Sequence, residues 1–306
     1  MTKRLFLFAG YDKDSIADPT LLHYLGVLSG LGDVIFTMDN ELPDTELRNI
    51  KGIPNVLHAS AVRHMEYDFG SYKRGYIWAR DNKILDKYDW VYLVNDSVLG
   101  PLFDLETILK DLESRGVDFT GMTTWGGKNI SVHIQSWFVG LSAKIFKAEF
   151  FDNFITNVRH QTEKKDIVYR YELGLSNLIL KRGFKHYVVF EHGGGIVYMK
   201  PYDGLLNGVP FIKKMALSNL NSINLLYSYN NEILVEHIIN YAARHKIDLK
   251  QKQSEEPYIK IFRFNLFALP LLSIKSKFEY GYKQYKLYLF DVFPIMKWIS
   301  NSGADN

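Results

Sequence analysis

The chain of 306 residues is 47% hydrophobic and 23% charged, with a formal net charge of +3 and no cysteine. The lack of cysteine excludes disulfides, thiolate zinc sites and a cysteine nucleophile, and the small net charge gives no argument for nucleic acid as a partner. No stretch reaches the roughly 18 apolar residues of a membrane-spanning helix, and the first apolar run is too short for a signal peptide, so we expect a cytoplasmic protein.

The first half of the chain alternates between short apolar strands and segments with helical spacing. Strands are predicted at residues 5–9, 33–37, 56–59, 90–94 and 119–122. Helices are predicted around residues 21–28, 43–52, 78–84 and 108–112. Residues 63–75 are polar, aromatic and glycine-containing, and are predicted as a loop. This alternation predicts an α/β fold with a mainly parallel sheet flanked by helices.

The second half is more mixed. A strand is predicted at residues 132–141, helices at 144–158 and 171–180, and a strand at 186–190. Three consecutive glycines begin at Gly193, and they predict either a mobile lid over a site or a tight turn that needs positive φ. The charged stretch 246–256 resembles a linker or a solvated helix end. We therefore divide the chain into a catalytic-type domain, residues 1–250, and a C-terminal extension, residues 251–306.

The extension has its own composition. From residue 257 onward it carries seven basic and three acidic residues, with aromatic residues between them. Basic and aromatic side chains together are typical of a membrane interface, so we expect a helical, aromatic extension at the inner face of the membrane. The alternative is that the aromatic residues pack on the main domain or on a second subunit.

A buried strand at residues 90–94 ends abruptly at Asn95, Asp96 and Ser97. A carboxylate at the carboxyl end of a buried strand lies where open α/β sheets bind their ligands. Mg²⁺ and Mn²⁺ prefer oxygen ligands, including carboxylates. We therefore interpret Asp96 as a metal ligand. The alternative is that these three residues only begin a turn.

Several segments taken together resemble one protein family. They are residues 8–14, 67–73, 95–101, 133–138, 171–176 and 208–213, although Gly10 stands where His is expected. In this order they resemble the rhamnan synthesis protein F family over roughly residues 4–215. Its members are bacterial glycosyltransferases of polysaccharide assembly related to the GT-A fold, a Rossmann-like mainly parallel sheet. The resemblance implies a nucleotide-sugar donor, with dTDP-rhamnose favoured, and a lipid-linked or growing glycan acceptor.

Donor binding is expected around the strand ends. Glycosyl transfer requires stabilisation of the leaving diphosphate, and Lys73 and Arg74 are the cations that we expect to contact it. Enzymes of the GT-A fold usually carry Asp-x-Asp at this strand end. Val94 occupies the first of these positions, so Asp96 stands alone and the need for Mg²⁺ or Mn²⁺ is left open.

Further residues are expected on the donor side. Tyr11, Asp12 and Asp39 follow the first strands and are candidates for base and ribose contacts, with ordinary loop polarity as the alternative. Asp68 would order its loop or contact the sugar, and a structural, hydrogen-bonded role is the alternative. Asn95 and Ser97 complete the donor-binding set beside Asp96.

Inverting transfer needs a group that takes the acceptor proton. Glu172 is predicted to open a helix, where the helix dipole would keep its carboxylate ionised, and a plain helix-terminal glutamate is the alternative. His133 is the rival base. Gln135 and Ser136 are expected to bind the acceptor, while His192 would line the lid or complete a metal site, or be structural.

These residues predict inverting transfer of a deoxyhexose to a bacterial surface polysaccharide. A nucleotidyltransferase is a second enzyme class, but it needs a triphosphate cradle and residues 10–12 form a poor one. The non-enzyme alternative is a catalytically silent sugar- or nucleotide-binding module of a polysaccharide assembly complex, which the missing first acid keeps open.

Overall fold

β1 (Arg4–Gly10) is buried along its whole length and is an interior strand of the main sheet. The computed structural model describes residues 2–127, 130–220, 224–227, 229, 231–249, 260–266, 269–279, 282–289 and 293–301. Within these residues two compact units are distinguished, residues 1–221 with 232–249, and residues 222–231 with 250–306.

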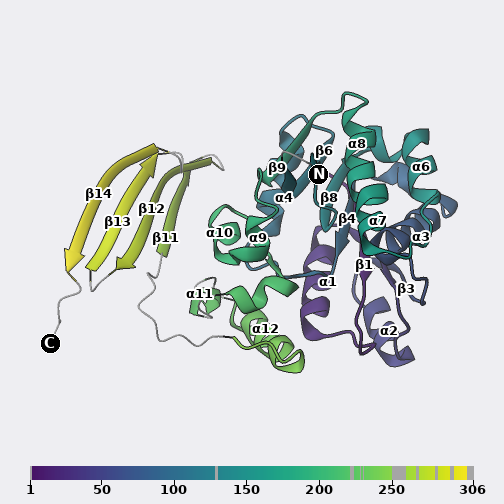
Figure 1. Ribbon diagram of the computed structural model, residues 1–306, viewed down its shortest axis with the longest axis horizontal. Helices are drawn as coiled ribbons and strands as arrows, with labels where there is room; N and C mark the ends of the chain where they lie inside the picture. The colour runs from purple at the N-terminus through teal and green to yellow at the C-terminus, as the bar shows by residue number, and fades with distance from the viewer. Residues whose placement is uncertain are drawn as a thin grey trace. The chain divides into compact units, whose positions relative to one another are not determined.

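In the described part of the first unit, eight strands form one mixed sheet in the order β3-β2-β1-β4-β8-β6-β7, and β9 also pairs with β6 (Figure 1). The other strands are β2 (Asp33–Met38), β3 (Val56–Ala61), β4 (Trp90–Asn95), β6 (Phe119–Gly127), β7 (Ile130–Ile134), β8 (Phe138–Ser142) and β9 (His186–Phe190). The first four strands of this order are parallel, and β8 runs antiparallel to both β4 and β6. The predicted α/β class with a mainly parallel sheet flanked by helices is confirmed.

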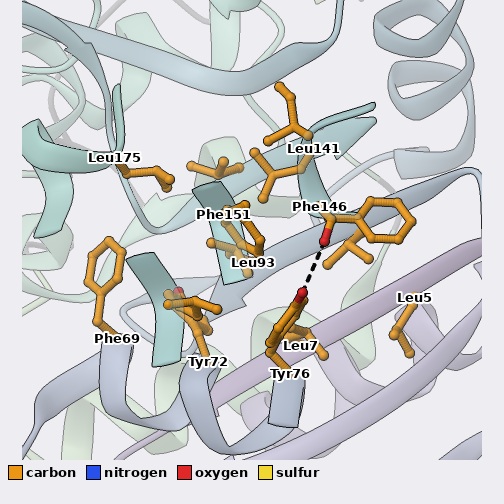
Figure 2. Close-up of a cluster of buried hydrophobic side chains, with 14 of the residues drawn as sticks. Leu5, Leu7, Phe69, Tyr72, Tyr76, Leu93, Leu141, Phe146, Phe151 and Leu175 are labelled. Carbon is orange, nitrogen blue, oxygen red and sulfur yellow. Dashed lines mark hydrogen bonds between the residues drawn. The ribbon is translucent and has the colours of Figure 1, made fainter. Parts of the chain in front are cut away.

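Successive residues of the central strands face opposite sides of the sheet, as the pleat requires. Leu5 and Leu7 belong to one apolar core, while Phe6 and Phe8 belong to another. Figure 2 shows the first core, where Tyr76 donates a hydrogen bond of 3.1 Å to the carbonyl oxygen of Phe146. Both faces are thus covered, which explains why the strands contain apolar runs without a polar face.

Helices supply the outer layers. The first core receives side chains from α3 (Tyr67–Asp81), α5 (Ala143–Phe146), α6 (Glu149–Thr156), α7 (Lys164–Ile167) and α8 (Leu173–Leu180). The second receives them from α1 (Pro19–Leu31), α2 (Asp44–Lys51) and α4 (Leu105–Ser114). Asp18 caps α1 by accepting hydrogen bonds from the backbone N–H groups of Thr20 and Leu21, with Pro19 as the first helical residue.

Several predicted boundaries were wrong. The loop expected at residues 63–75 ends at Glu66, because α3 begins at Tyr67 despite two glycines in its sequence. Residues 132–141 form two strands rather than one, and residues 144–158 form two short helices. α12 (Glu232–Arg244) was not predicted, although its buried residues recur at helical spacing.

A π-helical turn, Val168–Glu172, joins α7 to α8. The helical segment therefore begins at Lys164, and Glu172 does not open a helix as the sequence predicted. A helix dipole at this position therefore does not account for ionisation of the Glu172 carboxylate. Such π turns occur frequently at functional sites.

Short elements complete the first unit. They are β5 (Val98–Leu99), β10 (Ile212–Lys213), α9 (Ile196–Met199), α10 (Pro201–Leu206) and 3₁₀ segments at Leu85–Lys87 and Lys214–Asn219. β5 and β10 pair antiparallel, so that Lys213 lies opposite Val98.

The second unit contains α11 (Asn224–Tyr227) and a four-stranded antiparallel sheet. Its strands follow one another as β11 (Lys260–Leu266), β12 (Leu269–Glu279), β13 (Tyr282–Leu289) and β14 (Phe293–Asn301). The expectation of a helical extension was therefore wrong. Phe, Tyr and Ile are frequent in this segment, and these residues favour strands over helices. Among the described residues, no helix has the length and apolar character needed to cross a bilayer.

A buried ion pair fastens α4 to the sheet. Arg4 on β1 binds both carboxylate oxygens of Glu113, at 2.6 and 2.8 Å, and Tyr92 donates a third hydrogen bond to Glu113 at 2.9 Å. Both charged side chains are only 5% exposed.

We expect Glu113→Ala to lower the free energy of unfolding by about 3–5 kcal/mol, because it leaves the Arg4 charge buried without its partner. Asp111→Ala removes an exposed pair with Arg115 on the same helix and should cost less than about 1 kcal/mol. Urea denaturation of the two variants measures both values. Equal losses in the two would contradict this account of how α4 is held.

Candidate active site at the sheet switch point

The order of the parallel strands reverses between β1 and β4, because β2 and β3 lie on one side of β1 and β4 lies on the other. Ala9 pairs with Asn95, and the backbone N–H of Asp96 donates a hydrogen bond of 3.1 Å to the carbonyl oxygen of Ala9. Ligands of open α/β sheets bind beyond the carboxyl ends of the strands at such a point. Asp96 therefore has the location that the sequence predicted for it.

The Asp96 carboxylate has a cationic partner. Lys214 Nζ lies 3.3 Å from Asp96 Oδ2, and the backbone N–H of Tyr11 also hydrogen-bonds to Asp96. Burial raises the pKa of the Asp96 carboxyl, and Lys214 opposes this rise. Burial would lower the pKa of Lys214, but the charge and hydrogen bond of Asp96, together with Asp18 and Tyr241, outweigh burial and raise that pKa. Lys214 therefore stays charged at the end of β4.

The neighbouring Lys213 faces the next residue of the strand end. Its Nζ donates a hydrogen bond of 2.7 Å to Ser97 Oγ and lies 5.0 Å from the ring centre of Trp137 and 5.3 Å from that of Tyr198. The pairing of β5 with β10 brings both lysines here. Gly100 permits the approach, because a Cβ at that position would lie 2.7 Å from the carbonyl oxygen of Pro210.

Asn95 connects the strand end to α3. Its Nδ2 donates a hydrogen bond of 2.8 Å to Asp68 Oδ2, and its Oδ1 accepts hydrogen bonds from the backbone N–H and the hydroxyl of Ser97. Asn95 is 2% exposed. Asp68, Asn95 and Ser97 are thus brought together as one hydrogen-bonded group beside Lys213.

The two rival bases lie in direct contact. Glu172 Oε1 is 3.0 Å from His133 Nε2, and Glu172 Oε2 accepts a hydrogen bond of 2.6 Å from Ser136 Oγ. Burial would raise the pKa of Glu172, but the hydrogen bonds from His133 and Ser136 outweigh it and lower that pKa. The carboxylate is thus kept ionised by these two side chains.

The hydrogen bonds of His133 define its protonation state. Its Nδ1 lies 3.1 Å from the carbonyl oxygen of Ser131, and its Nε2 faces the Glu172 carboxylate. Both of these groups accept hydrogen bonds, so both ring nitrogens must donate and the ring is an imidazolium. Burial would lower the pKa of His133, but Glu172 and Ser131 outweigh it and raise that pKa. Of the two candidates, Glu172 is the one able to accept a proton.

α12 reaches the same end of the sheet. Arg244 Nη2 lies 2.6 Å from Asp12 Oδ2 and 3.1 Å from Asp18 Oδ2. Tyr241, one turn earlier, has Lys214 5.1 Å and Arg244 5.9 Å from its ring centre. Asp12, expected to contact the nucleoside, is therefore paired with Arg244 and is 7% exposed.

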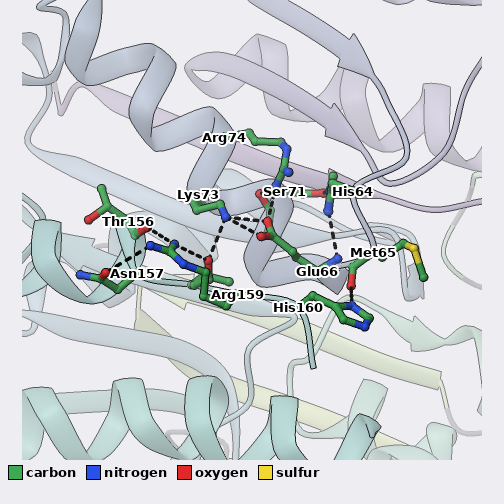
Figure 3. Close-up of polar contacts among 12 residues, drawn as sticks. His64, Met65, Glu66, Ser71, Lys73, Arg74, Thr156, Asn157, Arg159 and His160 are labelled. Carbon is green, nitrogen blue, oxygen red and sulfur yellow. Dashed lines mark hydrogen bonds and ion pairs between the residues drawn. The ribbon is translucent and has the colours of Figure 1, made fainter. Parts of the chain in front are cut away.

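Lys73 and Arg74, the cations expected to contact the diphosphate, both bind Glu66. Figure 3 shows both side chains directed at Glu66, with Lys73 Nζ 2.7 Å from Glu66 Oε1 and 2.8 Å from the carbonyl oxygen of Val158. Arg74 Nη1 is 2.5 Å from Glu66 Oε2. The helical start of α3 explains the difference, because it fixes the direction of side chains that the sequence assigned to a loop.

Tyr11 and Asp39 remain at the ends of β1 and β2. Asp39 Oδ1 accepts hydrogen bonds of 2.8 Å from the backbone N–H groups of His64 and Met65. The Tyr11 side chain is 49% exposed, and the Arg63 guanidinium lies 5.6 Å from its ring centre. Tyr11 thus presents an open ring, whereas Asp39 is engaged with the backbone.

The glycine turn is packed. Gly193 and Gly194 are buried, and a Cβ on Gly193 would lie 2.3 Å from the Phe190 ring. The positive φ of this turn, 56°, belongs to His192, whose side chain is exposed and whose N–H donates to Thr124 Oγ1. The tight-turn interpretation is therefore nearer to the structure than the mobile lid.

Gln135, expected to bind the acceptor, is buried and accepts a hydrogen bond of 2.6 Å from Thr123.

The side chains around Asp96 do not fit the metal site expected from the sequence. The Asp96 carboxylate faces an ammonium group, which competes with a hard cation for the same oxygen. Among the described residues, no group of three His, Asp or Glu side chains is arranged to hold a metal ion.

Sequence reasoning missed four residues of this region. Lys213 stands in one of the quoted segments but received no role, and Lys214, Tyr198 and Arg244 were not singled out. The dipeptide Lys213-Lys214 directly after an apolar run was a usable signal for the lysines. The distant Arg244 gave none, because only the position of α12 brings it to β1.

Fold and site together define an α/β protein with a carboxylate–lysine pair at the switch point of its sheet and a carboxylate–imidazolium pair nearby. The model of the family described as Rhamnan synthesis protein F matches residues 35–253. The chain belongs to this family, as its motifs predicted. Membership agrees with the expected enzyme class, a glycosyltransferase. No curated protein matches the chain in sequence.

Three solved structures are similar to this chain. The mannosyltransferase Ktr4p from S. cerevisiae is 11% identical with a TM-score of 0.37, over 56% of this chain and 63% of that one. Core-mannan synthase A from Aspergillus fumigatus, in a Mn/GDP form, is 10% identical with a TM-score of 0.31, over 57% and 70%. A glycosyltransferase involved in glycosylation of the major capsid of PBCV-1 is 12% identical with a TM-score of 0.31, over 55% and 76%.

We expect an NMR titration to give His133 a pKa above the ordinary value of 6.5, and Glu172→Gln to lower it, because burial then acts without the carboxylate. The raised pKa of His133 adds stability that is lost as the pH rises through it. The lowered pKa of Glu172 adds stability that is lost as the pH falls through it. The pair therefore contributes fully between about pH 4.3 and about pH 6.5.

Ser136→Ala is the matched control for this titration, because it removes one hydrogen bond to Glu172 and leaves its charge. It should change the pKa of His133 much less than Glu172→Gln does. A pKa of His133 at or below its ordinary value in the unmodified protein would show that the imidazolium assignment is wrong.

Proposed function

We propose that this protein is an inverting glycosyltransferase that moves a deoxyhexose, with dTDP-rhamnose as the favoured donor, to a lipid-linked or growing bacterial surface polysaccharide. One observation carries the proposal. Glu172 accepts a hydrogen bond from Ser136, and the ring of the next residue, Trp137, lies 5.0 Å from the ammonium of Lys213, which hydrogen-bonds to Ser97 at the end of β4. A proton acceptor and a cation thus contact adjacent residues at the point where α/β sheets bind ligands.

In the proposed reaction, the acceptor hydroxyl gives its proton to Glu172 as its oxygen forms a bond with the anomeric carbon. The bond from that carbon to the diphosphate oxygen breaks on the opposite face, and the electron pair leaves with the diphosphate. His133 and Ser136 hold Glu172 in place. Because both donate hydrogen bonds to it, they also keep the carboxylate ionised and ready to accept the proton.

The donor side of the proposal rests on the group around Asn95. Asp68 and Ser97 are held by Asn95 beside Lys213, and positive charge at this position would stabilise the negative charge that develops on the leaving group. The exposed ring of Tyr11, at the end of β1, offers a surface for the nucleobase. Ser136 hydrogen-bonds to Glu172, and we propose that it and the neighbouring Gln135 bind the acceptor.

We expect the purified protein to release nucleoside diphosphate from dTDP-rhamnose faster than from UDP- or GDP-sugars. Glu172→Gln should lower turnover by about 10²–10⁴-fold, the usual contribution of a general base, while nucleotide binding is retained. Chromatographic assay of the released nucleotide, with and without a bacterial lipid-linked glycan fraction, measures both.

Glu163→Gln is the matched control, because it removes an exposed carboxylate that pairs with Lys165. It should leave turnover unchanged. Full turnover in Glu172→Gln would remove Glu172 from the role of base. Binding of donors without any transfer or hydrolysis across the panel would instead favour the silent binding module.

We also propose that the protein acts at the inner face of the membrane. The last fifty residues support this, because they carry seven basic and three acidic side chains.

The full-length protein should sediment with vesicles of anionic lipid and not with vesicles of phosphatidylcholine. Lys283→Gln with Lys286→Gln should weaken this binding about thirtyfold, at about 1 kcal/mol for each lysine. Lys144→Gln, an exposed lysine of the first unit, is the control, and equal binding to both vesicle types would contradict the proposal.

A further inference from the structure

Three cations of the first unit gather at the carboxyl ends of β1 and β4. Lys214 is 3.3 Å from Asp96, Lys213 is 2.7 Å from Ser97 Oγ, and Arg244 bridges Asp12 and Asp18. We propose that Lys213, Lys214 and Arg244 hold the pyrophosphate of the nucleotide donor, in the place of a divalent cation. The inference rests on the proposed glycosyl transfer and identifies the groups that bind its leaving group.

Both lysines contact the end of β4. They are consecutive in the chain where β10 passes into the 3₁₀ segment, and they bind consecutive residues, Asp96 and Ser97. The backbone N–H of Lys214 also donates a hydrogen bond of 2.9 Å to the carbonyl oxygen of Ser97. This bond fixes the backbone of the lysine pair relative to β4, and the contacts with Ser97 and Asp96 orient the two ammonium groups, so they need little reorganisation when an anion arrives.

Arg244 supplies an independent observation. Its Nη2 makes both ion pairs, whereas its Nη1 is buried and has no hydrogen-bond partner among the described residues. Buried donors are nearly always hydrogen-bonded, so an unpaired guanidinium nitrogen indicates a missing acceptor. Phosphate oxygens are acceptors well suited to the planar guanidinium group.

Tyr241 relates these cations to one another. Lys214 and Arg244 lie 5.1 and 5.9 Å from its ring centre, so both positive charges are close to the same aromatic ring. The electron-rich face of the ring favours both. Asp96, Asp12 and Asp18 then act as counter-charges that keep the cations in place, which is a different role from that of metal ligands.

The position of the cations agrees with what glycosyl transfer needs. Lys213 lies 5.0 Å from the ring centre of Trp137, which directly follows Ser136, the residue that hydrogen-bonds to the proposed base Glu172. From there the trio extends to the ends of β1 and β4. Negative charge that develops on the diphosphate as the sugar leaves would be met by ammonium groups already in place. Asp96 remains essential in this scheme, because it orients Lys214.

The test is isothermal titration calorimetry of dTDP, UDP and GDP with the full chain, in chelator and in Mn²⁺. We expect at least one nucleoside diphosphate to bind in chelator with nearly the affinity found in Mn²⁺. Lys213→Met and Lys214→Met should each weaken this binding by at least about tenfold, the loss expected for one charge-assisted hydrogen bond. Lys214→Arg should keep most of the affinity.

Two controls separate binding from folding. Lys110→Met removes an exposed lysine of α4 that pairs with Glu106 and should leave binding unchanged. Lys214→Met leaves the buried Asp96 carboxylate without its partner and can therefore destabilise the fold. The double variant Asp96→Asn, Lys214→Met removes both charges, so it should fold yet still bind the nucleotide weakly. Recovery of full affinity in the double variant would overturn the proposal.

The outcomes distinguish this inference from the proposed function. Binding that disappears in chelator and returns with Mn²⁺, with no loss in Lys213→Met, would overturn the lysine site and leave glycosyl transfer standing. Failure of every nucleoside diphosphate to bind in either condition would overturn both.

Discussion

The parallel pairing of β1 with β4 is the constraint on which the site depends. It places residue 9 beside residue 95, and therefore brings a turn near the N-terminus next to a strand end some ninety residues later. The polar groups around Asp96 are positioned from that junction. Asp96 bonds to the backbone of Ala9 and Tyr11, and Asn95 reaches across to Asp68 on α3. Because the two strands are buried on both faces, the junction is rigid where the ligand would lie.

Opposite charges then fix the side chains. Three carboxylates of the site have a cation beside them: Asp96 has Lys214, Asp12 has Arg244, and Glu172 has His133. At Glu172, hydrogen bonds and the charge of His133 oppose the rise in pKa that burial alone would cause. The ion pairs hold positive and negative side chains in set positions at the site.

The sequence was informative wherever a local pattern determined structure. Apolar runs gave the strands, Asp18-Pro19 gave the start of α1, and the abrupt end of β4 located Asp96. The family was also recognised from short motifs. The partners of individual side chains were harder to predict from the sequence, because they depend on strand register and on the rotation of each helix. Lys73 was assigned to a flexible loop, yet α3 directs it to Glu66, and the phase of that helix is not visible in a glycine-containing segment.

Long-range contacts were beyond local reasoning. Arg244 lies 232 residues from Asp12, and only the placement of α12 joins them. Glu172 and His133 were named separately as rivals, although they bind one another. Their contact arises from a π-helical turn, for which a single sequence carries no clear signal.

That turn also determines how easily the carboxylate could be lost during divergence. A π turn contains one residue more than regular α-helical winding needs. Removal of one residue between 168 and 172 would restore even winding and rotate one side of the segment by about 100° relative to the other. If α8 kept its buried residues against the sheet, the rotated part would carry the acid away from His133 and Ser136. A relative could then keep the same architecture and have no carboxylate at this position.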